Sequence, residues 1–425
     1  MQRPPPLSRI WSIMTGALPA LAGGVVLLLL VSELRRDVIE VTPISVPVRL
    51  MEAGLTPEVV AQRLLDGVAR VEHQVRGEPM QRSGAEIAGS QPDFTVPIAG
   101  ISLRSVASVL RRLLGIHETR IQGEITVDGD MLRLRLRLSG EGVIADERVA
   151  DAYALIDHAA PAIVKATQAS LYAWWLAETA ASEAAVQETL GGMLGDTDNT
   201  AMENRTLRLL LSRSLARSGR AQEALAMNDT LLAEQPGYAI AIYGRARALR
   251  DLGRLDEAMA ELRRVQRLLP GAVFVHVGIA QVLRDRGEFS AALAELAPAL
   301  PPGRADSQAP TEAALTLLAL GRHAEALAYA QRAVAQDGKN ASAMTALGLA
   351  LLRLGRAAEG LAQFDHALAE APQWQEARLG RIEALMELGQ VMQARAELAA
   401  HAAAIAAVPR LKARLEALQT RRPGQ

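Results

Sequence analysis

Apolar and small residues return at a fixed interval of 34 positions through the second half of the chain. A glycine marks each copy, with a leucine four residues before it and an alanine or glycine five residues after it. The six glycines are Gly219, Gly253, Gly287, Gly321, Gly355 and Gly389. A constant period of this length is typical of stacked repeats, so residues 205–408 are predicted to be six copies of one unit.

The spacing inside each copy predicts a helical hairpin. The leucine and a small residue three positions before it, such as Leu215 and Ser212, share one face of a helix. The glycine ends that helix, because glycine enters the left-handed cap conformation without strain. A second helix is expected two or three residues later, and its alanine permits a close approach to the first. Pro298 is expected to shorten the second helix of the third copy.

This unit resembles the tetratricopeptide repeat, and the resemblance covers about half of the chain. The best copy, residues 341–374, carries that family's signature residues at Leu347, Gly348, Leu351, Gly355, Phe364, Ala367 and Pro372. Two copies depart from the pattern, because Asn228 and Ala330 replace the large apolar residue of the second helix. The resemblance implies an α–α superhelical solenoid in which the first helix of each unit lines a concave groove for protein or peptide partners.

Residues 10–31 contain no charged side chain and are predicted to cross a membrane as one helix, since about 20 apolar residues span the hydrocarbon core. A cleaved signal peptide, with small residues 20–22 at the cleavage site, is the alternative. Arginines flank the segment on both sides at Arg3, Arg9, Arg35, Arg36 and Arg49. The short, acid-free tail of residues 1–9 favours a cytoplasmic N-terminus. A single-pass protein of the bacterial inner membrane with its bulk in the periplasm is therefore predicted, and a cytoplasmic location stays open.

Residues 38–148 have the pattern of a small α+β module of order β-α-β-α-β-β. A strand is predicted at 38–41, a helix from Pro57 with Thr56 as its cap, a loop at 77–92 and a second helix from Ser102. Leucines alternate strictly with arginines over 131–138, which predicts a half-buried strand paired with 121–127 through a hairpin. The exposed arginines of that strand (Arg133, Arg135 and Arg137) either contact an anionic surface or solvate the sheet.

Composition narrows the range of functions. The chain of 425 residues has no cysteine and a formal net charge of -1, so disulfides, cysteine-bound metals and a generally basic nucleic-acid surface are excluded. The phosphate-binding GxxxxGK[ST] loop, the HExxH metal pair and the GxSxG nucleophile turn do not occur, and the seven histidines are scattered singly. We therefore predict no enzyme activity, no catalytic or metal-binding residues, no cofactor and no nucleic-acid partner.

The candidate binding residues come from the face of each first helix that points away from the packing stripe. This face carries arginines and aromatics in the early units, leucines in the middle units and glutamates at the end. The predicted groove residues are Arg213, Arg217, Tyr243, Arg247, Arg250, Phe274, Arg284, Leu315, Leu318, Leu349, Leu352 and Glu383. We expect an acidic, partly apolar protein segment to bind there. The alternative is that the arginines only solvate the helices.

The predicted function is that of a membrane-anchored scaffold that binds partners in the cell envelope. An accessory subunit of a membrane-bound enzyme complex for glycan synthesis, export or proteolysis is one alternative. A ligand sensor that uses the α+β module is another. The predicted parts are a tail (1–9), a transmembrane helix (10–31), the α+β module (38–148), a helical connector (149–204), six repeats (205–408) and a C-terminal capping helix with its tail (409–425).

Overall fold

The chain forms two compact units, which are described separately below. Unit 1 comprises Met1–Ala180 and Met193–Leu207, and unit 2 comprises Ala181–Gly192 and Arg208–Gln425. The computed structural model describes residues 38–75, 86–87, 95–96, 101–102, 109–110, 113, 119–180, 182–196, 199–301, 307–406, 408 and 411–420. Within those residues no helix has both the length and the apolar character to cross a membrane. The predicted transmembrane helix, residues 10–31, lies outside them.

Unit 1 is built on a five-stranded sheet of order β2-β1-β5-β6-β7. Its strands are β1 (Val38–Val41), β2 (Glu86–Ile87), β5 (Thr119–Asp128), β6 (Met131–Leu138) and β7 (Gly142–Val149). β1 runs parallel to β2 and β5, whereas β5, β6 and β7 are antiparallel. The predicted hairpin is confirmed, and Gly129 adopts φ 62° in its turn.

Four features of unit 1 differ from the sequence prediction. β2 lies within the predicted loop, and a short helix that was not predicted, α2 (Val48–Glu52), follows Pro47. β7 was not predicted, because its residues lack the strict alternation of β6. Ser102 ends the short strand β4 (Ile101–Ser102), which pairs with β3 (Thr95–Val96), so no helix begins there. The rest of that predicted helix falls almost entirely outside the described residues.

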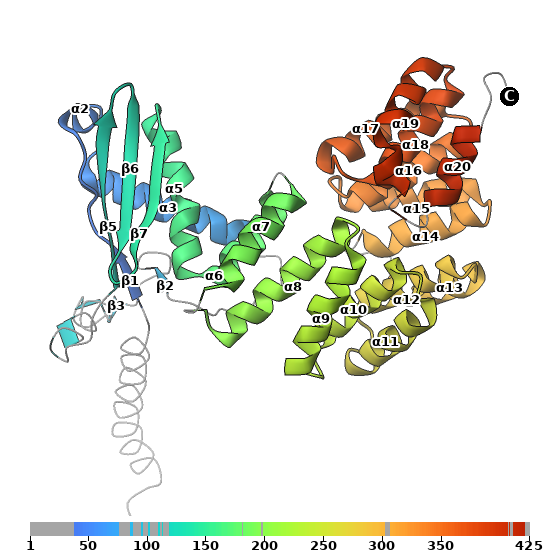
Figure 1. Ribbon diagram of the computed structural model, residues 1–425, viewed down its shortest axis with the longest axis horizontal. Helices are drawn as coiled ribbons and strands as arrows, with labels where there is room; N and C mark the ends of the chain where they lie inside the picture. The colour runs from blue at the N-terminus through green and yellow to red at the C-terminus, as the bar shows by residue number, and fades with distance from the viewer. Residues whose placement is uncertain are drawn as a thin grey trace, which may run out of the picture. The chain divides into compact units, whose positions relative to one another are not determined.

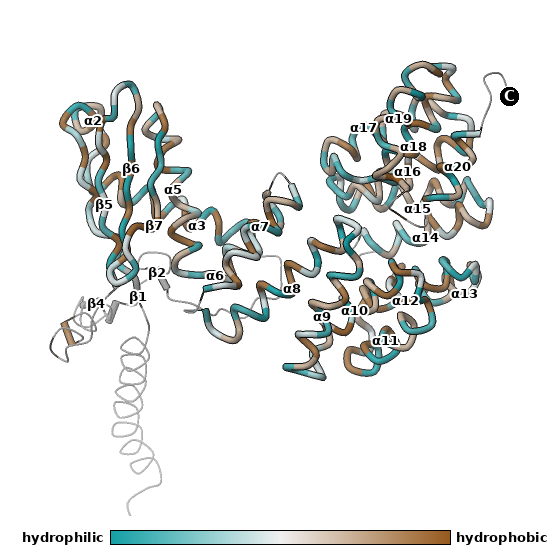
Figure 2. Tube along the Cα trace, in the orientation of Figure 1, coloured by the Kyte–Doolittle hydropathy of each residue, from teal (hydrophilic) through white to brown (hydrophobic). Residues whose placement is uncertain are grey.

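The leucines of β6 and two long helices form the core of unit 1. Leu134, Leu136 and Leu138 are buried, whereas the arginines between them are half-buried or exposed. Figure 2 colours the chain by hydropathy, so the alternation of apolar and polar residues can be followed along β6. The helices α3 (Pro57–Val75) and α5 (Ala152–Thr167) pack against this leucine face (Figure 1). α6 (Ala169–Thr179) adds Trp175, whose Nε1 donates to Gln74 Oε1 at 2.8 Å. This tryptophan therefore helps to join α6 to α3.

Unit 2 contains six consecutive helical hairpins (Figure 1). The first helices of the hairpins are α8 (Ala201–Arg217), α10 (Ala239–Asp251), α12 (Val273–Asp285), α14 (Gln308–Ala319), α16 (Ala341–Arg353) and α18 (Gln375–Glu387). The second helices are α9 (Ala221–Glu234), α11 (Leu255–Leu268), α13 (Phe289–Leu296), α15 (His323–Gln336), α17 (Ala357–Glu370) and α19 (Val391–Ala406). The repeat predicted from the glycines is therefore confirmed as a helical hairpin.

The glycines act as helix caps in every hairpin. Their φ angles lie between 74° and 80°, a region that residues with a side chain rarely adopt. The residue after each glycine donates its N–H to the carbonyl of the recurring leucine, as from Arg220 to Leu215 at 2.9 Å. This closes each first helix with a Schellman-type bond and turns the chain into the second helix.

At most joints, one side chain of the second helix fits between two small residues of neighbouring first helices. Phe364, which is fully buried, occupies the space that a Cβ on Gly348 or Gly380 would need, since such atoms would lie 2.7 and 2.5 Å from its ring. In the fourth hairpin the equivalent residues are Ala330, Ala314 and Ala346, which form one cluster. A large side chain thus pairs with two glycines and a small one with two alanines, which keeps the packing dense.

Asn228 takes the same place in the first hairpin, with Ser212 and Gly244 on either side. It is fully buried, and its Nδ2 donates to Ser212 Oγ at 2.5 Å and to the Ala224 carbonyl at 2.8 Å. A Cβ on Gly244 would lie 2.6 Å from Asn228 Oδ1. The departure from the repeat pattern noted in the sequence is therefore compensated by a hydrogen bond to a polar partner.

The joint between the third and fourth hairpins is different. Glu312 occupies the position that is glycine or alanine at the other joints, and it is buried with 3% of its surface exposed. α13 has only eight residues and passes into a 3-10 turn at Ala297–Ala299, which confirms the shortening predicted from Pro298. Leu296, which corresponds to Ala330 and Phe364, is fully buried here, so this joint combines apolar packing with a buried charge.

Helices at both ends of the array cover its terminal hairpins. α7 (Glu183–Leu194) precedes the first hairpin, and Gln187 Nε2 donates to Ser218 Oγ at 2.6 Å. α20 (Lys412–Thr420) follows the last, where Leu415 and Leu418 pack into a cluster with Leu385. Such end helices bury apolar faces that would otherwise be exposed in a stack of repeats.

The fit around Phe364 can be tested with a double-mutant cycle. Gly380→Ala should destabilise the protein by about 1–3 kcal/mol through overpacking, and Phe364→Ala by about 3–5 kcal/mol through cavity formation. The combined variant should lose clearly less than the sum, because the new methyl group enters the space that the ring vacates. Urea unfolding followed by circular dichroism measures all three. Additive losses would contradict the packing described here.

Candidate functional site

The first helices of the hairpins line a cavity of about 1000 Å³ in unit 2. α8, α10, α12, α14, α16 and α18 all contribute, as do Arg414 on α20 and Leu411 just before that helix. Its apolar lining includes Leu315 and Leu318 on α14 and Leu349 on α16. We call this cavity the inner groove. Its volume lies at the upper end of the range for ligand pockets.

Eight of the twelve predicted groove residues line this cavity, and four do not. The lining residues are Arg217, Tyr243, Arg247, Arg250, Arg284, Leu315, Leu318 and Leu349. Arg213 and Phe274 are half-buried beside the groove, and the Phe274 ring packs edge-on against Tyr243 with 4.9 Å between centroids. Whether any of these residues contacts a partner stays a prediction.

Two of the predicted residues belong to the interior instead. Leu352 is buried in a cluster with Phe364 and Ala384, because the small residues of α18 bring that helix across it. Glu383 is buried and accepts hydrogen bonds from Arg353 Nη2 at 3.2 Å and from Arg414 Nη2 at 2.7 Å. The prediction that Glu383 gives the groove an acidic end is therefore wrong, because two arginines already neutralise its carboxylate.

Most arginines of the inner groove are also paired within the protein. Arg217 Nη2 lies 3.2 Å from Glu183 Oε2 on α7. Arg284 Nε donates to Glu312 Oε1 at 2.5 Å, from the third hairpin to the fourth. These contacts join each helix to its neighbour along the groove. The predicted gradient from basic to acidic is therefore replaced by ion pairs that cancel locally.

Arg250 occupies the centre of this charge network. Its Nη2 donates to Asp251 Oδ1 at 3.0 Å, its Nη1 donates to Gln281, and its Nε lies 3.6 Å from Asp285 Oδ2. Burial alone would lower the pKa of Arg250, but Asp251 and Asp285 raise it above its usual value. The guanidinium therefore remains charged and fixed in place, which makes it part of the groove's framework.

Arg247 is the exception among the arginines of the inner groove. It is half-buried, it lines the cavity one helical turn from Tyr243, and it has no hydrogen bond or ion pair within the described part of the chain. The sequence placed Arg247 among several equivalent arginines. It could not distinguish this residue, because most of the carboxylates that pair the others lie on different helices.

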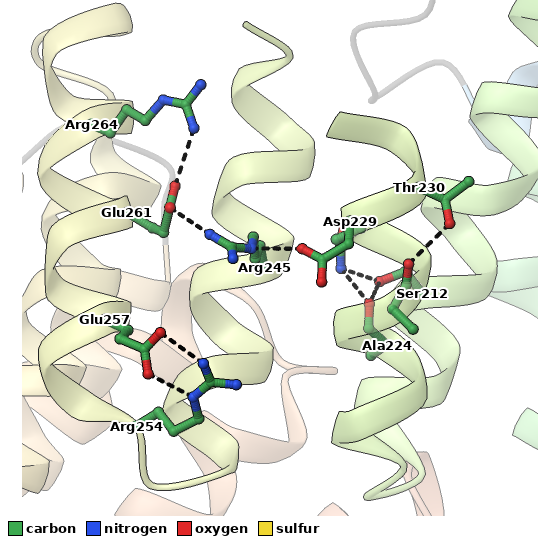
Figure 3. Close-up of polar contacts among 11 residues, drawn as sticks. Ser212, Ala224, Asp229, Thr230, Arg245, Arg254, Glu257, Glu261 and Arg264 are labelled. Atoms are coloured by element: carbon green, nitrogen blue, oxygen red, sulfur yellow. Dashed lines mark hydrogen bonds and ion pairs between the residues drawn. The ribbon is translucent and has the colours of Figure 1, made fainter. Parts of the chain in front are cut away.

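Further ion pairs brace the array away from the groove. Arg245 Nε donates to Asp229 Oδ1 at 2.7 Å and Arg245 Nη1 donates to Glu261 Oε1 at 2.6 Å, joining three helices (Figure 3). The same triad recurs four repeats later as Asp365, Arg381 and Glu397. The sequence analysis missed it, although an arginine eight residues before the glycine in both units was an available signal.

Four hairpins also share a bidentate pair at the start of the second helix, such as Arg254 with Glu257 (Figure 3). The corresponding pairs are Arg220–Glu223, Arg322–Glu325 and Arg356–Glu359. The hydrogen bonds from each arginine hold the pKa of the glutamate below its usual value. These exposed pairs contribute little to stability individually.

The exposed arginines of β6 are largely occupied as well. Arg133 donates two hydrogen bonds of 2.6 Å to Asp146 on β7, and Arg135 Nη2 donates to the same carboxylate at 3.1 Å. The hydrogen bonds from Arg133 hold the pKa of Asp146 well below its usual range. Arg137 is exposed. This arrangement favours the interpretation of a solvated sheet face over an anion-binding surface.

No group of three or more histidine, cysteine, aspartate or glutamate side chains that could hold a metal ion occurs among the described residues. The inner groove offers apolar contacts, hydroxyl and amide groups and one unpaired guanidinium. This set can hold a ligand by shape, hydrogen bonding and charge.

Comparison with known proteins identifies the repeats. The family model described as a tetratricopeptide repeat matches residues 209–273 and 311–374. The chain therefore contains tetratricopeptide repeats, and the matched stretches leave out most of the irregular third hairpin. No curated protein matches the chain at a significant level.

Several solved structures are similar to the array. A thermophilic TPR protein of Thermus thermophilus is 24% identical with a TM-score of 0.39, and the match covers 43% of this chain and 99% of that one. PilW, a type IV pilus biogenesis factor, is 17% identical with a TM-score of 0.37, covering 48% and 94%. YrrB, a TPR protein with an unusual peptide-binding site, is 20% identical with a TM-score of 0.27, covering 45% and 96%. These similarities concern the helical-repeat fold alone.

The buried ion pair at the third joint gives a direct test. Glu312→Gln should destabilise the protein by about 1–3 kcal/mol, because it removes the buried carboxylate that Arg284 Nε holds and leaves this guanidinium only Asp285, at 3.7 Å. The control Glu359→Gln breaks an exposed pair with Arg356 and should cost no more than about 0.5 kcal/mol. Urea midpoints of the two variants provide the comparison. Equal small losses would show that Glu312 does not hold the joint.

Proposed function

We propose that this protein is a membrane-anchored scaffold that binds segments of partner proteins in the inner groove. Tetratricopeptide repeats bind protein or peptide partners, and the array contains six helical hairpins of this kind. The observation that carries the proposal is the cavity of about 1000 Å³ along the first helices, with Leu315, Leu318 and Leu349 in its wall. Apolar side chains gathered in a groove are a common feature of interaction sites.

The anchoring part of the proposal comes from the sequence. Residues 10–31 are free of charge and long enough to span the hydrocarbon core. We place the protein in the inner membrane of a bacterium with both folded units in the periplasm. The internally paired groove supports a scaffold, because a fixed lining recognises a partner without first reorganising.

Site-specific photo-crosslinking in cells tests the binding proposal. A photoreactive phenylalanine analogue in place of Leu318 should form covalent adducts with partner proteins, because this position faces the inner groove. The control is Leu268 on α11, which is 47% exposed and does not line the cavity. Adducts at 318 and none at 268 are expected. Equal labelling at both positions would contradict the groove as the binding surface.

The same cells test the anchor. The full-length protein should stay with the membrane after a carbonate wash, and a version without residues 1–37 should be soluble. Protease added to spheroplasts should degrade the array if it is periplasmic. Release of the full-length protein by carbonate would remove the anchoring proposal. A single stoichiometric enzyme as the only adduct would favour an accessory subunit over a general scaffold.

A further inference from the structure

The inner groove contains six arginines, and five of them already hold a carboxylate of the protein itself. Those five are Arg217, Arg250, Arg284, Arg353 and Arg414. Arg247 alone has no hydrogen bond or ion pair in the described part of the chain. A ligand anion that binds any of the five must share the guanidinium with an internal carboxylate or displace it. An anion that binds Arg247 displaces nothing.

The neighbours of Arg247 add hydrogen-bond donors and aromatic surface. Gln281 on α12 holds the same position in the next repeat and also lines the cavity. Its Oε1 accepts from Arg250, and its Nε2 has no partner among the residues that the structure describes. Tyr243 lies one turn before Arg247, with its ring fixed against Phe274. Two unused donor groups therefore line the same half-buried surface.

A carboxylate, the common anionic group of protein segments, fits this surface. The planar guanidinium binds carboxylates in paired hydrogen bonds, and a half-buried site strengthens that attraction relative to water. Each of the other arginines of the groove holds a carboxylate of the protein, whereas Arg247 holds none in the described part of the chain, so its positive charge is available to a ligand.

The apolar residues Leu315 and Leu318 set a second requirement for the ligand, at a definite distance from Arg247. Leu315 and Leu318 lie on α14, two helices along the groove from Arg247. Since packed helices lie roughly 8–10 Å apart, the separation is on the order of 20 Å. An extended chain advances about 3.3 Å per residue, so about six residues bridge it.

We propose that the inner groove selects a protein segment with one carboxylate for Arg247 and apolar side chains about six residues away for Leu315 and Leu318. This inference rests on the proposed function of the groove and adds the chemistry of the partner. Arg247 alone, and not a broad basic surface, binds the carboxylate of the partner.

Purified full-length protein in detergent is tested against an array of immobilised peptides. Each peptide carries one glutamate and a pair of leucines three to nine residues away, and each has a twin with glutamine in place of glutamate. The wild type should prefer the glutamate peptides by about tenfold or more, with the best spacing near six. Arg247→Gln should remove this preference without a change in thermal stability, since Arg247 has no partner in the described part of the fold.

Arg267→Gln is the matched control. Arg267 is an exposed arginine of the same repeat, on α11, and it does not line the cavity. This variant should keep the full preference. Preserved discrimination in Arg247→Gln would overturn the proposal, and so would equal loss in both variants, which would indicate general charge attraction. Competition by inorganic phosphate at the same concentration as a free glutamate peptide would identify an unspecific anion site and also overturn it.

These experiments distinguish recognition of a carboxylate by Arg247 from binding in the inner groove as such. Crosslinks at position 318 together with an indifferent Arg247 would leave the groove as a binding site and refute the acidic partner. Leu318→Glu should abolish binding of all leucine peptides, with or without glutamate. If it does not, the groove is not the binding surface and both statements fail.

Discussion

The close approach of neighbouring helices is the constraint on which the array depends. At each regular joint, a side chain of the second helix fits between two small residues of adjacent first helices. Phe364 with two glycines and Ala330 with two alanines fill equivalent spaces with different volumes. Dense packing of this kind determines where each first helix lies, and hence the width and lining of the inner groove.

One joint adds a buried ion pair to this packing. At the third joint, Glu312 replaces the small residue and pairs with Arg284, and α13 is the shortest second helix of the array. Similar ion pairs join neighbouring helices elsewhere along the groove, as between Arg217 and Glu183 and between Arg353 and Glu383. A lining paired in this way is preorganised, and it offers a ligand few free charges. Selectivity then depends on the residues that the fold leaves without a partner.

Sequence reasoning succeeded where a feature depends on residues within one helix or turn. Gly355 and Leu351 specify the cap of their own helix, and the alternation over β6 specifies its own faces. It failed where the decisive contact comes from another element. Leu352 sits on the predicted face of α16, but α18 covers it. Glu383 lies at the spacing expected for the groove face of α18, but it is buried because Arg353 and Arg414 contact it from two other helices. The spacing of residues indicates a face and does not indicate what packs across it.

Hydrogen exchange of the native full-length protein tests the central claim most directly, because it measures local stability helix by helix. Joints in which a side chain such as Phe364 packs between two small residues should be more stable than the joint that contains Glu312. Amides of α17, which carries Phe364, should therefore exchange much more slowly than those of α13. Equal protection of α13 and α17, or faster exchange in α17, would contradict the claim that this packing holds the array together.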